Sequence, residues 1–222
     1  MIAAVHYGRG VRQLARSKTG IPLQNKIVCA GNSLTYGTGT TTPATDAYPA
    51  QLASLITSRG YTSFQTSITN VGISGRTTAQ MITDATTLVD PLRDSPTWPM
   101  NILIAWEGTN SIAQSGLTAV QAGDAMKTYC AARRALGWYV YACTMIVAGT
   151  ISETVRGDYN AIIKDNAQIG VSWDGVIDIG ADTRIDPTPA AGIYVDSYHI
   201  TTVGQSYVAD TVANAIGYSA PI

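Results

Sequence analysis

Charged residues are scarce in this chain of 222 residues, where they make up 13% of the sequence, roughly half the usual fraction. The 14 lysines and arginines nearly balance the 15 aspartates and glutamates, so the formal net charge is −1. A chain with so little net charge has no overall field to attract nucleic acid or an anionic membrane. We therefore expect neither as a partner, and we expect a surface built largely from Thr, Ser, Asn, Gln and Gly.

Cysteines and long apolar runs are also few. The three cysteines are an odd number without close spacing, which argues against a disulfide framework or a zinc site. Cys29 and Cys143 stand in apolar runs and are predicted to be buried thiols. No run approaches the roughly 20 apolar residues of a membrane span, and residues 1–20 lack the continuous apolar core of a secretory signal. The sequence predicts a soluble protein without membrane insertion, and leaves secretion or attachment to a larger assembly open.

Basic residues concentrate near the N-terminus, where residues 1–45 contain five Lys or Arg and no acidic residue. Residues 1–25 are predicted to form an arm or linker, because Gly20 and Pro22 would end any helix formed by the preceding VRQLARSK. Residues 26–222 have a suitable length for one domain with a single core. The arm either links or docks, or it binds a partner, and the oligomeric state is left open.

From residue 26 onward, segments of strand length alternate with segments of helical periodicity; most of the strand segments are apolar, and the one at 64–72 alternates and is β-branched. The predicted strands span residues 26–31, 64–72, 101–106, 138–146 and 175–180. The predicted helices span residues 47–60, 77–92, 117–137, 152–170 and 201–217. Apolar strands without polar alternation are typical of a sheet buried on both faces, and intervening helices are typical of parallel crossovers. The sequence therefore predicts a three-layer α/β/α sandwich with a mostly parallel sheet of about five strands.

Small and polar residues follow the predicted strands, at the positions where open parallel sheets bind their ligands. The segments are GNSLT (31–35), NVGISGR (70–76), EGTN (107–110) and, before the last helix, DSYH (196–199). Because all four can reach the same edge of the sheet, we expect their side chains to form one site.

These segments contain the groups needed for acyl transfer through a serine: a nucleophile, a base, a group that orients the base, and oxyanion donors. Ser33 is the candidate nucleophile. One of the two histidines lies in the arm, so His199 is the candidate base, and Asp196 can bind its Nδ1–H. The candidate oxyanion donors are the N–H groups of Ser33 and Gly75 and the side chain of Asn110. Singly, each segment is also explained as a helix cap, a surface turn or a loop; their order and shared edge favour catalysis.

With these blocks the chain resembles the SGNH hydrolases, also called GDSL esterases or lipases. The family's Gly-Asp-Ser-Leu block stands here as GNSL, its glycine-donor block as NVGISG, its Gly-x-Asn block as GTN and its Asp-x-x-His block as DSYH, in the family's order over most of the chain. The resemblance implies a flavodoxin-like fold and ester hydrolysis through an acyl-serine, with Ser33, Asp196 and His199 as the triad and no metal or organic cofactor. Two positions depart from the family pattern: Asn32 replaces the usual aspartate, and Ser111 stands where many relatives have one.

Aromatic and amide side chains near the blocks favour a sugar ester as substrate. The candidate substrate contacts are Asn32, Tyr36, Arg76, Trp106 and Tyr198. Arg76 is expected either to meet an anionic substrate or to lie in solvent, and Trp106 either to contact substrate or to pack in the core. We expect hydrolysis of small-molecule or glycan esters with short acyl groups, above all O-acetyl groups on carbohydrate.

Three other functions are weighed against this one. A lysophospholipase or thioesterase acting on lipid acyl groups would use the same machinery and is the main alternative. A carbohydrate-binding module without catalysis is less favoured, because no catalytic residue is missing. Nucleotide binding is disfavoured, because the first loop has neither Gly-x-Gly-x-x-Gly nor a following Lys-Ser/Thr.

Overall fold

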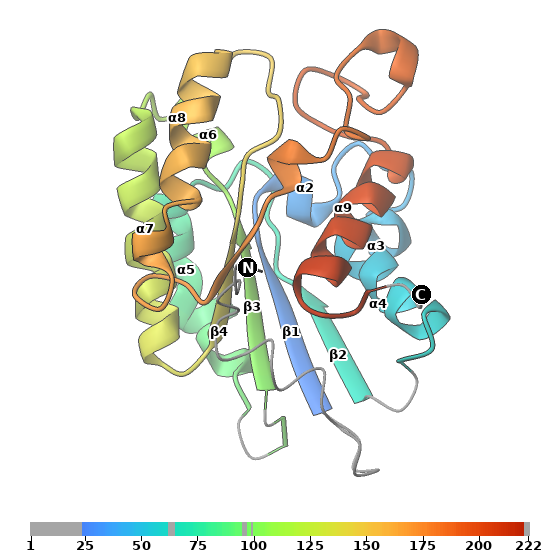
Figure 1. Ribbon diagram of the computed structural model, residues 1–222, viewed down its shortest axis with the longest axis vertical. Helices are drawn as coiled ribbons and strands as arrows, with labels where there is room; N and C mark the ends of the chain where they lie inside the picture. Colours follow the sequence, from blue (N-terminus) through green and yellow to red (C-terminus); the bar gives the residue numbers. More distant parts are fainter. Residues whose placement is uncertain (1–23, 62–64, 95–96, 99, 220–222) are drawn as a thin grey trace, which may run out of the picture.

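Five parallel strands form the centre of the computed structural model, which describes residues 24–61, 65–94, 97–98 and 100–219 (Figure 1). The strands are β1 (Gln24–Gly31), β2 (Gln65–Asn70), β3 (Met100–Trp106), β4 (Tyr139–Cys143) and β5 (Gly175–Ile177). Their order in the sheet is β2-β1-β3-β4-β5, and every neighbouring pair is parallel. This is the flavodoxin-like doubly wound order, so the predicted fold class is confirmed.

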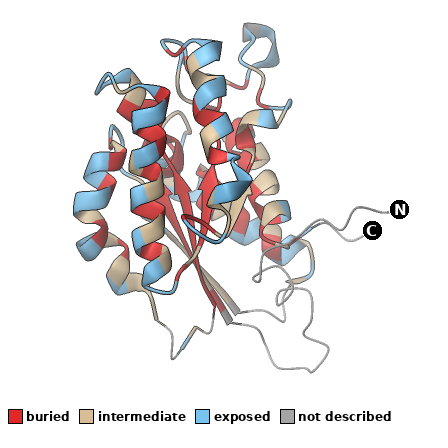
Figure 2. Cartoon of the chain, turned by 60° about the vertical axis from the view of Figure 1, so that its left-hand side comes forward, coloured by how far each residue is buried: buried red, intermediate tan, exposed pale blue. Residues whose placement is uncertain are grey.

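Helices cover both faces of the sheet (Figure 1). One layer contains α4 (Tyr48–Ser58) and α9 (Thr202–Ala215), and the other contains α5 (Thr78–Leu88), α7 (Ala119–Ala135) and α8 (Glu153–Ile163). Alternate residues of β1 pack into the two cores: Ile27 and Cys29 against the first layer, Val28 and Ala30 against the second. Burial on both faces explains why residues 27–30 of this strand are an unbroken apolar run (Figure 2).

The cysteines lie in these two cores, as free and buried thiols. Burial raises the pKa of the Cys29 thiol to about 12, and it raises the pKa of Cys143 and of Cys130 as well. A thiol with a raised pKa carries little thiolate at neutral pH and is a poor nucleophile. The prediction of buried thiols at Cys29 and Cys143 is confirmed, and these residues act as core packing.

Two predicted elements end earlier in the structure, and at each end a side chain forms hydrogen bonds with the backbone. Strand β4 ends at Cys143, because the Asn160 side chain bonds both the N–H and the carbonyl of the next turn's Met145, at 2.7 and 2.9 Å. Helix α8 ends at Ile163, and the Asp165 side chain then starts a separate 3₁₀ turn, η3 (Asn166–Gln168). Side-chain bonds of this kind compete with regular elements.

The first strand includes the last residues of the predicted arm. Strand β1 begins at Gln24, two residues before the predicted start. The rest of the predicted arm, residues 1–23, lies outside the described residues. Within the part of the chain that the structure describes, no helix is long and apolar enough to cross a membrane.

The strand order also locates a crevice. β1 and β3 are neighbours in the sheet, although their crossover helices lie on opposite faces, and ligands of doubly wound sheets bind where the order reverses in this way. The loops that follow β1 and β3 carry Ser33 and Asn110.

Candidate active site

Ser33 stands at the sharp turn between β1 and the short helix α2 (Ser33–Tyr36). Asn32 is the N-cap of α2, and its Oδ1 accepts a hydrogen bond from the N–H of Leu34 at 2.9 Å. Gly31 has no room for a side chain, because a Cβ there would lie 2.4 Å from the carbonyl oxygen of Trp106. The glycine therefore lets the end of β1 approach the end of β3, and the cap turns the chain sharply at the serine.

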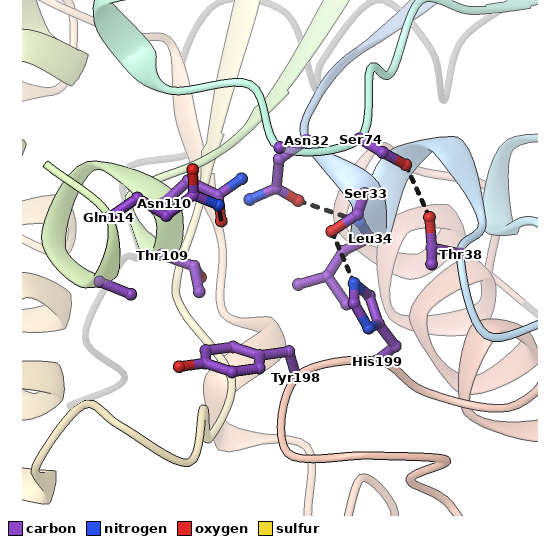
Figure 3. A pocket seen from close by; sticks show the side chains of 12 residues that line it. Asn32, Ser33, Leu34, Thr38, Ser74, Thr109, Asn110, Gln114, Tyr198 and His199 are labelled. Carbon is purple, nitrogen blue, oxygen red and sulfur yellow. Dashed lines mark hydrogen bonds between the residues drawn. The ribbon is translucent and has the colours of Figure 1, made fainter.

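The structure brings Ser33, His199 and Asp196 together. His199 Nε2 lies 3.0 Å from Ser33 Oγ, and His199 Nδ1 lies 2.8 Å from Asp196 Oδ2. Figure 3 shows the imidazole facing the serine hydroxyl. The second oxygen of Asp196 accepts the N–H groups of Tyr198 and His199, at 2.7 and 2.8 Å. One carboxylate thus orients the imidazole and shapes the turn that carries it.

Asp196 has the charge state that this geometry requires. Partial burial raises the pKa of its carboxyl, but hydrogen bonds from the His199 ring and from two backbone N–H groups outweigh that effect. The net pKa lies below the ordinary value of 3.8. The ionised carboxylate favours a proton on Nδ1 of His199, which leaves Nε2 free to accept the proton of Ser33.

The segment that carries Asp196 and His199 lies between η5 (Pro189–Ala191) and α9 and has little regular structure. It docks on the loop after β4. The N–H of Gly149 donates to the carbonyl of Ser197 at 2.7 Å, and the hydroxyls of Thr150 and Tyr198 form a short hydrogen bond. The position of His199 therefore depends on contacts between two loops.

Asn110 approaches the site from the opposite wall, on the short helix α6 (Thr109–Ala113) after β3 (Figure 3). Its Nδ2 donates to the carbonyl of Arg76 at 3.1 Å, and its Oδ1 accepts from Gln114 Nε2 at 3.0 Å. These two bonds fix the orientation of the amide. One of the two Nδ2 hydrogens remains for a ligand.

Backbone donors complete this wall. Gly75, in the loop after β2, has φ +78°, a conformation that favours glycine. The N–H of Ser33 belongs to the first turn of α2, where N–H groups have no acceptor within the helix. Both residues line the same cavity as Asn110.

Glu107 is a buried carboxylate whose role was not predicted from the sequence. Its Oε1 accepts the backbone N–H groups of Asn110 and Ser111, at 2.7 and 3.3 Å, and its Oε2 accepts the hydroxyls of Thr78 and Ser111, at 2.5 and 2.7 Å. The carboxylate therefore satisfies the free donors at the start of α6, the helix that presents Asn110. Glu107 comes directly after the buried strand β3, and this position in the sequence could have identified it as a residue of the site. Ser111, one of the two positions that depart from the pattern of the resemblance, turns its hydroxyl to Glu107.

The cavity between these walls has a volume of about 340 Å³. The proposed triad serine and histidine, Gly75 and Asn110 line it, as do two of the candidate substrate contacts, Asn32 and Tyr198. Figure 3 shows the Tyr198 ring across the cavity from Asn32. The remaining lining includes hydroxyl and amide side chains on both walls, among them a hydrogen-bonded hydroxyl pair between Thr38 and Ser74.

The structure does not bring the other three candidate contacts into the cavity. Arg76 is 3% exposed, and its guanidinium donates to the backbone carbonyls of Gly31 and Val71, so it neither lies in solvent nor faces a substrate. Trp106 is buried, and its Nε1 donates to the carbonyl of Thr144 at 3.1 Å. Of the two expectations for Trp106, packing in the core is therefore the one that the structure shows. Tyr36 is exposed outside the residues that line the cavity.

The chain matches one family of known proteins in sequence and several solved structures in fold. Residues 29–206 match the model of the GDSL-like lipase/acylhydrolase family. No curated protein sequence matches the chain significantly. Among solved structures, the acetylxylan esterase Axe2 from Geobacillus stearothermophilus is 15% identical with a TM-score of 0.71, covering 92% of this chain and 100% of that one.

Two further solved structures are similar over most of their length. TesA is 13% identical with a TM-score of 0.69, covering 86% of this chain and 97% of its own. LAE5, an α/β hydrolase from the metagenome of Lake Arreo in Spain, is 14% identical with a TM-score of 0.67, covering 87% and 95%. At these identities the structural likeness concerns the fold alone.

Proposed function

Since the chain belongs to the GDSL-like lipase/acylhydrolase family and is a carboxylic ester hydrolase of that family, we propose that it cleaves esters through an acyl intermediate on Ser33. The observation that carries the proposal is the continuous hydrogen-bonded line from Ser33 Oγ through both ring nitrogens of His199 to Asp196. A serine hydroxyl is a weak nucleophile until a base accepts its proton, and this geometry provides that base.

In the proposed acylation step, Ser33 Oγ attacks the ester carbonyl carbon while its proton passes to His199 Nε2. Asp196 stabilises the resulting imidazolium. The negative oxygen of the tetrahedral intermediate accepts hydrogen bonds from the N–H groups of Ser33 and Gly75 and from Asn110 Nδ2. The C–O bond to the alcohol then breaks, and the alcohol leaves with the proton from His199.

Deacylation repeats these steps with water. His199 takes a proton from a water molecule as its oxygen attacks the acyl carbon. The same donors stabilise the second tetrahedral intermediate. Its collapse returns the proton to Ser33 Oγ and releases the carboxylic acid.

The proposed substrate carries a short acyl group, most simply acetyl, on a carbohydrate. Amide and hydroxyl side chains and one aromatic ring line the cavity together with Leu34 and Ala113, and the amide and hydroxyl groups can pair with the hydroxyls of a sugar. The similarity to an acetylxylan esterase supports the same class. Lipid acyl groups are the alternative, because the same triad and oxyanion donors would cleave them.

A chain-length series tests this substrate class. Hydrolysis of 4-nitrophenyl acetate, butyrate, octanoate and palmitate would be measured for the wild type and for Ser33→Ala. We expect the highest kcat/KM on acetate or butyrate, and then release of acetate from acetylated xylo-oligosaccharides. A preference for octanoate or palmitate would contradict the short-chain proposal and favour the lipid alternative.

A further inference from the structure

Arg76 is a buried arginine that bonds backbone carbonyls in place of a carboxylate. Among the residues that the structure describes, no acidic side chain forms an ion pair with it. Its Nε and Nη2 donate to the carbonyl of Gly31 at 3.2 and 3.0 Å, and Nη2 also donates to the carbonyl of Val71 at 2.7 Å. Burial lowers the pKa of the guanidinium, but arginine stays charged in proteins. These carbonyls therefore hold a buried positive charge.

The guanidinium joins the end of β1 to the loop after β2. Its Nη2 group has two hydrogens in one plane, so it bonds the carbonyls of Gly31 and Val71 at the same time. Gly31 lies two residues before Ser33, and Val71 begins the loop that carries Gly75. One planar group thus sets the distance between the two segments that carry the proposed backbone oxyanion donors.

The backbone of Arg76 supports the same set of donors. Its N–H donates to the carbonyl of Ile73 at 3.1 Å and closes a four-residue turn. Gly75 is the third residue of this turn and has φ +78°, the sign that a type II turn requires there. The carbonyl of Arg76 accepts Nδ2 of Asn110 at 3.1 Å. Arg76 is therefore bonded to the segments or side chains that supply all three proposed oxyanion donors.

We propose that Arg76 is a positioning residue whose guanidinium holds the three oxyanion donors at the separation that the tetrahedral intermediate needs. This inference rests on the proposed function. A donor stabilises the oxyanion when it lies about 2.7–3.1 Å from that oxygen, and a displacement of about 1 Å can lower the rate about 10²-fold. An apolar side chain would fill the same space without burying a charge. Packing therefore does not explain the arginine, whereas the spacing of the two carbonyls does.

The test compares Arg76→Met, which removes every side-chain donor, with Arg76→Lys, which keeps the charge but loses the planar group. For 4-nitrophenyl acetate, at a temperature where the variants are folded, we expect kcat to fall about 10²-fold in Arg76→Met. The fall in Arg76→Lys should be smaller but measurable, because a single ammonium does not reproduce a bidentate guanidinium. KM should change little in both variants, since the donors act on the transition state.

Arg133→Met is the matched control for the loss of a buried arginine. Arg133 is 7% exposed and pairs through Nε and Nη2 with the carboxylate of Asp90, and it is not among the residues that line the cavity. Its replacement should lower the thermal midpoint and leave kcat unchanged. Loss of stability is thereby separated from loss of position.

A second measurement reports on the oxyanion donors directly. Phenylboronic acid bonds Ser33 Oγ through boron and forms a negatively charged tetrahedral adduct that resembles the intermediate. If Arg76 positions the donors, the inhibition constant should rise in Arg76→Met by about the factor by which kcat falls. A purely structural role would leave the inhibition constant of the folded variant unchanged, as expected for Arg133→Met.

The outcomes separate the two proposals. If the wild type hydrolyses the ester and Ser33→Ala does not, but Arg76→Met keeps the wild-type kcat and inhibition constant, the inference is overturned and the proposed function stands. Full kcat in Arg76→Lys would also overturn it, because the planar group would then be dispensable. If the wild type shows no esterase activity, or Ser33→Ala retains it, the proposed function fails and the inference fails with it. If Arg76→Met does not fold, the kcat and inhibition constant of Arg76→Lys decide the question alone.

Discussion

The two walls of the candidate active site are built differently. The wall with Ser33 and Asn110 follows directly from the ends of two central strands and rests on buried polar groups such as Glu107. The wall with Asp196 and His199 is a loop, and the Asp196 side chain is 52% exposed. The proposed nucleophile and oxyanion donors are therefore positioned by the core, whereas the proposed base is positioned by loop contacts. Activity and stability should respond separately to changes on the two walls.

Substituting Asp196, on the exposed wall, should have the largest effect on activity and almost no effect on stability. In Asp196→Asn, the amide no longer favours the proton on Nδ1 of His199, so kcat should fall by about 10³–10⁴-fold. Because the side chain is half exposed, the free energy of unfolding in urea should change by less than about 1 kcal/mol. Asp186→Asn, in the loop before η5, should retain full activity, since an asparagine oxygen can still accept the N–H of Thr188. Equal losses in the two variants would contradict the assignment of Asp196.

The buried wall should show the opposite balance. Glu107→Ala leaves two backbone N–H groups and two hydroxyls without their acceptor, so the free energy of unfolding should fall by about 2–4 kcal/mol. Loss of kcat should accompany it, because Asn110 loses the cap of its helix. Glu153→Ala, which removes an exposed ion pair with Arg156, should cost less than about 1 kcal/mol and leave kcat unchanged. A fully stable Glu107→Ala variant would show that the carboxylate does not support the wall.

Removing the contact between the two loops should have a smaller effect on activity. Tyr198→Phe and Thr150→Val each remove one partner of the short hydroxyl hydrogen bond while keeping the shape of the side chain. Each should lower kcat/KM severalfold, because the segment that carries His199 loses one of its ties. The double variant should be no worse than either single variant, since both remove the same interaction. Additive losses would mean that the two hydroxyls act independently.

The smallest expected effect is the pH dependence of stability. The pKa of Asp196 is lower in the folded protein than its ordinary value of 3.8, so its contribution to stability is present above that value and is lost as pH falls below it. The difference in unfolding free energy between the wild type and Asp196→Asn should therefore be larger at about pH 6 than at about pH 3. A difference that grows on acidification would have the wrong sign for a lowered pKa.

The parts of the molecule that the sequence predicts are those with local signals. Apolar runs predict most of the strands, and the alternating, β-branched pattern of residues 64–72 predicts β2. Small residues after the strands predict which segments meet at the edge of the sheet. The short helices α2 and α6 were not predicted, because four or five residues carry no helical periodicity and depend on caps. Arg76 was assigned to substrate or solvent because a charged residue in a loop is usually exposed.

The errors at the site concern long-range burial. Arg76 is buried because two backbone carbonyls, Gly31 and Val71, accept its guanidinium, and one of them lies 45 residues away. Glu107 is buried because hydroxyls and N–H groups from two helices surround it. Neither arrangement leaves a pattern within a short window of sequence. The catalytic roles of Ser33, Asp196 and His199 remain proposals that the geometry supports.

The most direct test of the account is to trap the nucleophile. Diethyl 4-nitrophenyl phosphate transfers a phosphoryl group to an activated serine and releases 4-nitrophenolate, which is measured by absorbance, and peptide mass spectrometry locates the adduct. The account predicts one equivalent of 4-nitrophenolate per chain, a diethylphosphoryl group on Ser33, and no release by Ser33→Ala or by His199→Ala. His6→Ala, which changes the other histidine, should react like the wild type. An adduct on another residue, or labelling of Ser33→Ala at the wild-type rate, would contradict it.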